Sequence, residues 1–217
     1  MRIVQPPRPQ YFFVLCCLVA LLILPVVVSA FAAPGRALSL LGLLVPVLAV
    51  AAASETRLHR RVAILLAVVC AATNAEGLAH ITSLPGETGA ASALVFLGYT
   101  TYLLLNGVLR SRRVTSDVIA GALASYLMIG LTWAFAYGLV EMMAPGSIKP
   151  PDGARVDLQT LVYYSYITLM TIGYGDVTPA GGLARVLAVL EGVTGVAFTT
   201  IILAALVAML LGGKRGE

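Results

Sequence analysis

The chain has 217 residues, of which 59% are apolar and only 11% are charged. Ordinary soluble domains are about 45 to 50% apolar and about 25% charged, so the composition excludes a soluble domain and indicates a membrane protein. The net charge of +4 does not indicate a nucleic-acid partner, because the basic residues fall in short clusters between apolar runs.

Long apolar runs predict an all-α membrane protein with six transmembrane helices. A span needs about 20 apolar residues, and such runs cover 11–33, 37–53, 62–80, 90–109, 117–143 and 183–212. Ten of the 14 Lys and Arg alternate with these runs in a way that places both termini in the cytoplasm: Arg2, Arg8, Arg57, Arg60, Arg61, Arg110, Arg112, Arg113, Lys214 and Arg215. One alternative stays open, because Val28-Ser-Ala30 resembles a signal-peptide cleavage site.

Residues 1–110 are expected to form a four-helix transmembrane domain that resembles a voltage sensor in topology but lacks its charges. The run 90–109 contains no Lys or Arg. Steep voltage dependence needs about three to four charges per subunit inside the field, so we expect no conventional voltage sensing. Glu76 and His80 lie one helical turn apart in the third run. A pH sensor, a satisfied polar pair and simple exposure at the membrane interface are the alternatives there.

Residues 111–217 are expected to form the functional half of the chain, with an outer helix at 114–143 and an inner helix at 183–212. Between them Asp157 is placed to cap a helix over 157–170, which is too short to span the membrane. This helix must therefore enter the bilayer and return through the stretch TLMTIGYGD at 168–176. Irregular backbone at membrane depth is tolerated only where it is buried in protein or lines a watery cavity. Glycine permits the backbone turns that direct carbonyl oxygens toward a dehydrated cation.

The stretch Thr171-Ile-Gly-Tyr-Gly-Asp176, with Thr168 before it, resembles the selectivity filter of tetrameric potassium channels. The runs at 130–137, 139–141 and 187–195 look like those of the small bacterial type with six spans, one pore loop per subunit and no voltage-sensor arginines. The resemblance implies that residues 171–176 form a filter in a homotetramer, with K+ as the permeant ion and no cofactor. It implies K+ binding by the backbone carbonyls and the Thr171 hydroxyl of a filter made of Thr171, Ile172, Gly173, Tyr174 and Gly175.

Further residues are expected to support the filter or to line the pore. The expected supports are Thr168, Tyr163, Tyr164, Asp176 and Glu191. Gly195 stands where the family often has a hinge glycine, and close helix packing is the alternative. At 100° per residue one face of the inner helix carries the expected lining and gate: Val196, Thr199, Leu203 and Val207. Glu191 projects about 130° from that face, which favours a brace behind the filter over a charge in the pore.

The sequence thus predicts a passive potassium channel, not an enzyme, in a plasma membrane such as a bacterial inner membrane. Its expected partners are K+, membrane lipids and further copies of the chain, with no nucleic acid. No soluble regulatory domain is expected, because only residues 212–217 follow the expected pore. Two alternatives are a weakly selective monovalent cation channel and a non-conducting subunit whose leading helices bind another membrane protein.

Overall fold

The computed structural model describes residues 10–30, 57–73, 86–111 and 114–213. This part of the chain is almost entirely helical. Its helices are α1 (Gln10–Ala30), α3 (Arg57–Thr73), α4 (Glu87–Leu109), α5 (Ser116–Met143), α6 (Leu158–Leu169) and α7 (Gly182–Gly213). A single turn of 3-10 helix, η2 (Pro151–Gly153), and the two-residue strands β1 (Ile148–Lys149) and β2 (Thr178–Pro179) lie around α6.

Three of the described helices are long and apolar enough to cross a membrane: Glu87–Leu109, Ser116–Met143 and Gly182–Ile202. The prediction of a mostly helical membrane protein is thereby confirmed by the length and composition of these three helices. The run expected at 37–53 lies outside the described residues, and so does 74–80 of the run expected at 62–80. Glu76 and His80 fall in that second gap. The count of six spans therefore stays a prediction.

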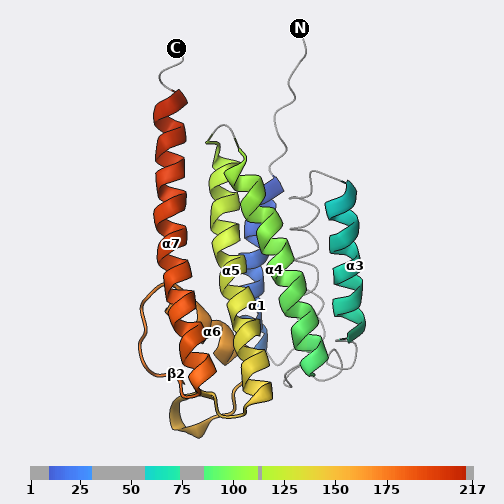
Figure 1. The fold of residues 1–217 in the computed structure, drawn as a ribbon, viewed down its shortest axis with the longest axis vertical. Helices are drawn as coiled ribbons and strands as arrows, with labels where there is room; N and C mark the ends of the chain where they lie inside the picture. The colour runs from blue at the N-terminus through green and yellow to red at the C-terminus, as the bar shows by residue number, and fades with distance from the viewer. Residues whose placement is uncertain (1–9, 31–56, 74–85, 112–113, 214–217) are drawn as a thin grey trace.

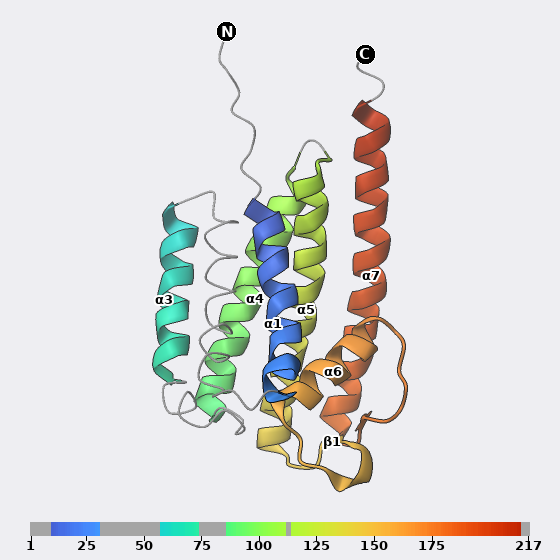
Figure 2. The same cartoon turned by 180° about the vertical axis from the view of Figure 1, so that it is seen from behind.

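Helix α5 is the centre of the arrangement, because it contacts α1, α4, α6 and α7, whereas α3 contacts α4 at the outer edge. Figure 2 shows short α6 at one end of the bundle, beside the first half of α7, close to β1. Figure 1 shows the start of α1 and the end of α7 together at the other end. Since the helices run back and forth between these two ends, α6 lies at the end opposite the start of α1 and the end of α7.

Side-chain caps decide where the helices of the second half begin. Thr115 has an extended backbone (φ −117°, ψ 162°), and its hydroxyl oxygen accepts from the Val118 amide at 3.3 Å. The outer helix therefore begins at Ser116 and not at 114 as expected. Asp157 caps α6 by accepting from the Thr160 amide at 2.8 Å, so this helix covers Leu158–Leu169 and not 157–170. Helix α7 extends one residue beyond the predicted 183–212 at each end.

An apolar core joins α1, α3, α4 and α5. It includes Val14, Leu18, Cys70, Phe96, Leu104 and Met128, all of which are buried. Hydroxyls inside these helices bond the carbonyl oxygen one turn earlier, as Thr100 does to Phe96 at 2.8 Å and Ser125 to Gly121 at 2.8 Å. Such bonds satisfy these two hydroxyls within their own helices. Other side chains bond between helices: Thr73 to Ser92 at 2.7 Å, His59 to Tyr99 at 2.9 Å, and Thr101 to Thr132 at 3.2 Å.

Candidate functional site

Helix α6 is held against α5 by two side chains on its buried face. The Tyr166 hydroxyl donates to the Leu127 carbonyl oxygen at 2.6 Å, and the Ser165 hydroxyl lies 2.7 Å from the Gly130 carbonyl oxygen. Gly130 is required at this contact, because a Cβ there would overlap the Tyr166 ring. The two bonds fix the depth and rotation of α6, and hence the place where the chain leaves it.

The chain that leaves α6 turns back on the end of that helix. The Thr171 amide donates to the Thr168 carbonyl at 2.9 Å, and the Ile172 amide donates to the Ile167 carbonyl at 2.8 Å. The Gly173 amide also donates to the Ile167 carbonyl, at 3.2 Å. These N–H groups thus satisfy carbonyls that the end of a helix leaves free. Residues 171–173 are thus anchored to the end of α6 by their amides.

The backbone of this stretch changes handedness at every second residue. Thr171 (φ 58°), Gly173 (φ 55°) and Gly175 (φ 79°) are left-handed, whereas Ile172 and Tyr174 are not. For threonine this conformation costs about 1–2 kcal/mol. An alternation of this kind allows successive carbonyls to face the same side. Among the described residues, no donor reaches a carbonyl oxygen of residues 171–174. The result is a row of unpaired oxygens.

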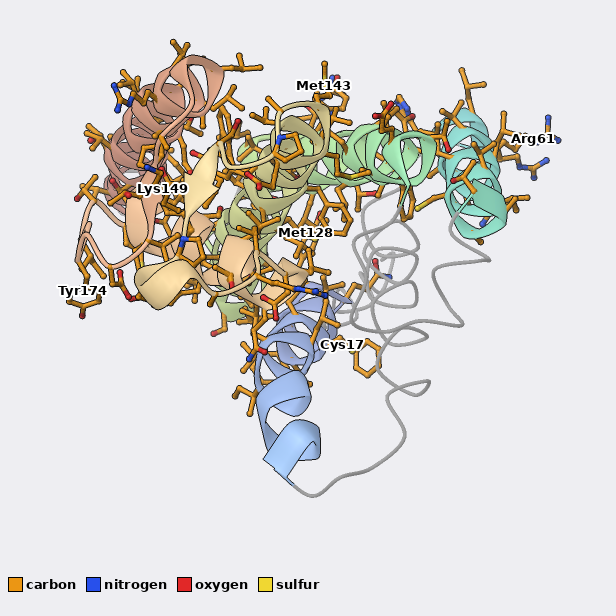
Figure 3. The ribbon with its side chains drawn as sticks, turned by 90° about the horizontal axis from the view of Figure 1, so that it is seen from below. Cys17, Arg61, Met128, Met143, Lys149 and Tyr174 are labelled. Atoms are coloured by element: carbon orange, nitrogen blue, oxygen red, sulfur yellow. The ribbon has the colours of Figure 1, made fainter. Side chains whose placement is uncertain are left out.

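This row lies at the surface of the single chain. All residues from Thr171 to Asp176 are exposed, including 71% of Tyr174 and 47% of Ile172. Seen along the helices, Tyr174 points away from the bundle, on the side opposite Arg61 (Figure 3). The stretch is therefore available to something outside this chain.

The segment after the row is tied both to α6 and to the loop before α6. Tyr163 on α6 donates its hydroxyl to Asp176 Oδ2 at 2.7 Å, and the Val177 amide donates to Oδ1 at 3.0 Å. The hydrogen bond from Tyr163 is the main cause that lowers the pKa of Asp176. Beyond it β2 pairs with β1, with Ile148 opposite Pro179. Two expected support residues, Tyr163 and Asp176, are thus brought together.

Replacing Tyr163 by phenylalanine is expected to raise the pKa of Asp176 toward its ordinary value of 3.8. Because the folded-state pKa is lowered, the ionised carboxylate stabilises the loop above that ordinary value, and this contribution is lost as the pH falls through the lowered pKa. Acid unfolding or acid inactivation should therefore begin at a higher pH in Tyr163→Phe. The control is Tyr102→Phe, which removes the hydroxyl of an exposed tyrosine on α4. Equal acid midpoints in all three proteins would contradict the assignment.

The other expected supports lie deeper. Tyr164 is buried and meets the Tyr137 ring edge-on at 4.9 Å, with half-buried Thr168 beside it. Glu191 on α7 is fully buried. Its Oε2 accepts from the Tyr137 hydroxyl at 2.6 Å, and its Oε1 lies 2.6 Å from the Ser165 hydroxyl. Glu191 therefore contacts α5 and also α6, the helix that leads into residues 171–176.

Sequence reasoning missed Tyr137 and Ser165 as partners of Glu191. They lie 54 and 26 residues away along the chain, so no helical spacing connects them. One signal was available for Ser165, which is the single small polar residue in the aromatic run Tyr163-Tyr164-Ser165-Tyr166. A small hydroxyl in such a run is a candidate for a contact between closely packed helices.

On α7 the expected hinge and lining residues separate into two groups. Gly195 is buried against the end of α6, where a Cβ would overlap the Leu169 carbonyl. Val196, Thr199 and Val207 are exposed. A shallow concavity is lined by Thr199, Thr200, Ala204 and Val207. The side chain of Leu203 lies outside what the structure describes.

Comparisons with known proteins show which class of protein the second half of the chain resembles. A family model described as "Ion channel" matches residues 123–211, which include the row of carbonyls and Glu191. Protein LctB of Bacillus caldotenax is 32% identical over 108 residues, which are 48% of this chain and 80% of that protein. Two pore potassium channel c of Oryza sativa subsp. japonica is 32% identical over 89 residues, which are 41% of this chain and 18% of that protein. No solved structure matches.

Proposed function

Because this chain belongs to the ion channel family, we propose that it is a passive, potassium-selective channel in which four copies surround one pore. It conducts rather than catalyses. The observation that carries the proposal is the row of unpaired, exposed carbonyl oxygens at 171–174, produced by left-handed backbone at Thr171, Gly173 and Gly175.

Carbonyl oxygens in such a row suit a dehydrated monovalent cation. Removing the water around an ion costs tens of kcal/mol in a low-dielectric medium. Closely spaced carbonyl oxygens replace that hydration in potassium filters. The K+ ligands are then the carbonyls of Thr171, Ile172, Gly173 and Tyr174 with the Thr171 hydroxyl. The name of the rice relative, a two pore potassium channel, supports K+ as the permeant ion.

A single chain supplies one side of such a filter. Unpaired backbone oxygens cannot face lipid, so the stretch must face protein or water at membrane depth. Copies related by a cyclic axis would place equivalent carbonyls in rings around that axis. Helix α7 also leaves room for neighbours, because only 17% of its membrane window is buried, against 61% for α5. These features support a homotetramer with α7 innermost and with Val196, Thr199, Leu203 and Val207 along the pore.

Helix α6 adds an electrostatic preference for cations. Its C-terminal end at Leu169 leads directly into the carbonyl row. The end of a helix carries the equivalent of roughly half a negative charge, and such an end attracts cations within about one turn. Copies of α6 around the axis would all direct this end toward the ion.

The proposed topology follows from the charges and the two ends of the bundle. The start of α1, the end of α7 and Arg110 at the end of α4 would face the cytoplasm, and Lys149, Arg155 and Arg185 the outside. Residues 1–110 would form a sensor-like domain beside the pore domain of 111–217. Helix α4 contains no basic residue, so this domain would not confer steep voltage dependence.

Reconstitution of the purified chain in potassium-loaded liposomes tests the proposal. We expect a K+ flux, a reversal potential close to that of K+ in K+/Na+ gradients, and a shallow conductance–voltage relation. A reversal potential midway between those of K+ and Na+ would favour the weakly selective alternative. Tetramers that carry no flux but copurify with a stoichiometric membrane partner would favour the non-conducting subunit. A monomeric assembly would overturn the proposal.

A further inference from the structure

The hydrogen bonds around Ser165 contain one hydrogen too few if Glu191 is ionised. The Ser165 hydroxyl lies 2.7 Å from the Gly130 carbonyl oxygen and 2.6 Å from Glu191 Oε1. A hydroxyl has one hydrogen, and a carbonyl oxygen only accepts. One hydrogen cannot make two short and nearly straight bonds. The second contact therefore needs a hydrogen from another source, and the Glu191 carboxyl is the group able to supply it.

We propose that Glu191 is a neutral carboxylic acid that acts as a three-way connector. Its Oε1 hydroxyl donates to Ser165 Oγ, Ser165 donates to the Gly130 carbonyl oxygen, and Tyr137 donates to Glu191 Oε2. In this arrangement every short contact has one hydrogen and one acceptor. Helices α5, α6 and α7 are joined by a chain of oriented hydrogen bonds without a net charge.

The surroundings of Glu191 favour the neutral form. Its side chain is fully buried, and its hydrogen-bond partners among the described residues are hydroxyls and not cations. The titratable groups that face it are tyrosines: Tyr126 and Tyr137 from α5, and Tyr164 and Tyr166 from α6. Burying an ionised carboxylate without a paired cation is strongly unfavourable. Tyrosine hydroxyls carry no charge at neutral pH, so the hydrogen bond from Tyr137 offsets that cost only in part.

Glu141 in the same chain shows the opposite pattern. Its Oε1 accepts from the Gly146 amide at 2.7 Å, and its Oε2 accepts from the Ile148 amide at 2.8 Å. Each amide brings its own hydrogen, so these two contacts need none from the Glu141 carboxyl group. Glu141 is therefore an internal reference for the behaviour expected of an ordinary carboxylate.

Infrared spectroscopy of the reconstituted, full-length channel at neutral pH tests the protonation state. We expect a carbonyl stretching band of a buried carboxylic acid, with an intensity of one group per chain. Glu191→Gln should lose this band, whereas Glu141→Gln should keep it and lose carboxylate intensity instead. The absence of an acid band from the wild-type spectrum would overturn the proposal, even if neither variant assembled. A band that persists in folded Glu191→Gln would overturn it too.

A second measurement tests the connecting role. Glutamine offers an N–H to Ser165 and a carbonyl to Tyr137, as the neutral acid does, whereas alanine offers neither. Thermal stability lost in Glu191→Ala should therefore be largely recovered in Glu191→Gln. Equal losses in both variants would overturn the role. The connection to filter position rests on the proposed function, but neither readout requires conduction, so a protein without K+ flux could still pass both tests.

Discussion

Alanine in place of Gly173 is expected to reduce K+ flux at least about hundredfold, since each 1.4 kcal/mol corresponds to about a factor of ten. Gly173 has φ 55°, and within its own chain an added Cβ would meet nothing within 4 Å, so the cost expected inside one chain comes from the backbone. A left-handed residue with a side chain costs about 1–2 kcal/mol, and a tetramer would carry this cost four times around one ion path. Relaxation of φ would turn the neighbouring carbonyls away from the ion.

Gly153 provides a matched control for this substitution. It is also left-handed, with φ 67°, and an added Cβ would also have open space around it. It lies in η2, outside the carbonyl row. Gly153→Ala should therefore have a similar intrinsic backbone cost and nearly normal flux in the same liposome assay. If both variants lost flux to a similar extent, backbone strain at any left-handed glycine would explain the loss. That result would contradict the assignment of Gly173 to the filter.

Gly195→Ala is expected to destabilise the protein by about 1–3 kcal/mol, the usual range for overpacking a filled site. This corresponds to a fall in Tm of about 2 to 12 °C, as measured by thermal unfolding in detergent. The reason is that a Cβ at Gly195 would overlap the Leu169 carbonyl at the end of α6. Backbone cannot rotate out of the way as a side chain can. The displaced end of α6 would also carry the carbonyl row with it, so flux should fall.

Gly192, almost one turn earlier on the same helix, separates close packing from a hinge. An added Cβ there would meet nothing within 4 Å. Since alanine favours helix over glycine by about 1 kcal/mol, Gly192→Ala should keep or raise Tm. If α7 needs glycine for bending and not for packing, Gly195→Ala would change gating while leaving Tm unchanged. That result would contradict the packing interpretation.

Much of the fold was predictable because its signals are local. Apolar runs predict α4, α5 and α7, and caps such as Asp157 lie next to the helix they begin. The class of protein followed from the motif at 171–176, and the match to the ion channel family over 123–211 confirms the class. The starts of α5 and α6 lie two residues and one residue later than predicted, because the cap residue itself stays outside the helix. Helix α7 is one residue longer than predicted at each end.

The sequence by itself determined that this is a helical membrane protein of the ion channel class, with one glycine-rich motif between two apolar helices. Only the tertiary structure decided that Gly195 is buried against the end of α6 and that Glu191 meets Tyr137 and Ser165. The physical reason is the separation along the chain over which each kind of signal acts. Apolar periodicity and caps act between neighbours in the chain, whereas a buried polar group takes whichever partners the packing of distant helices brings within about 3 Å.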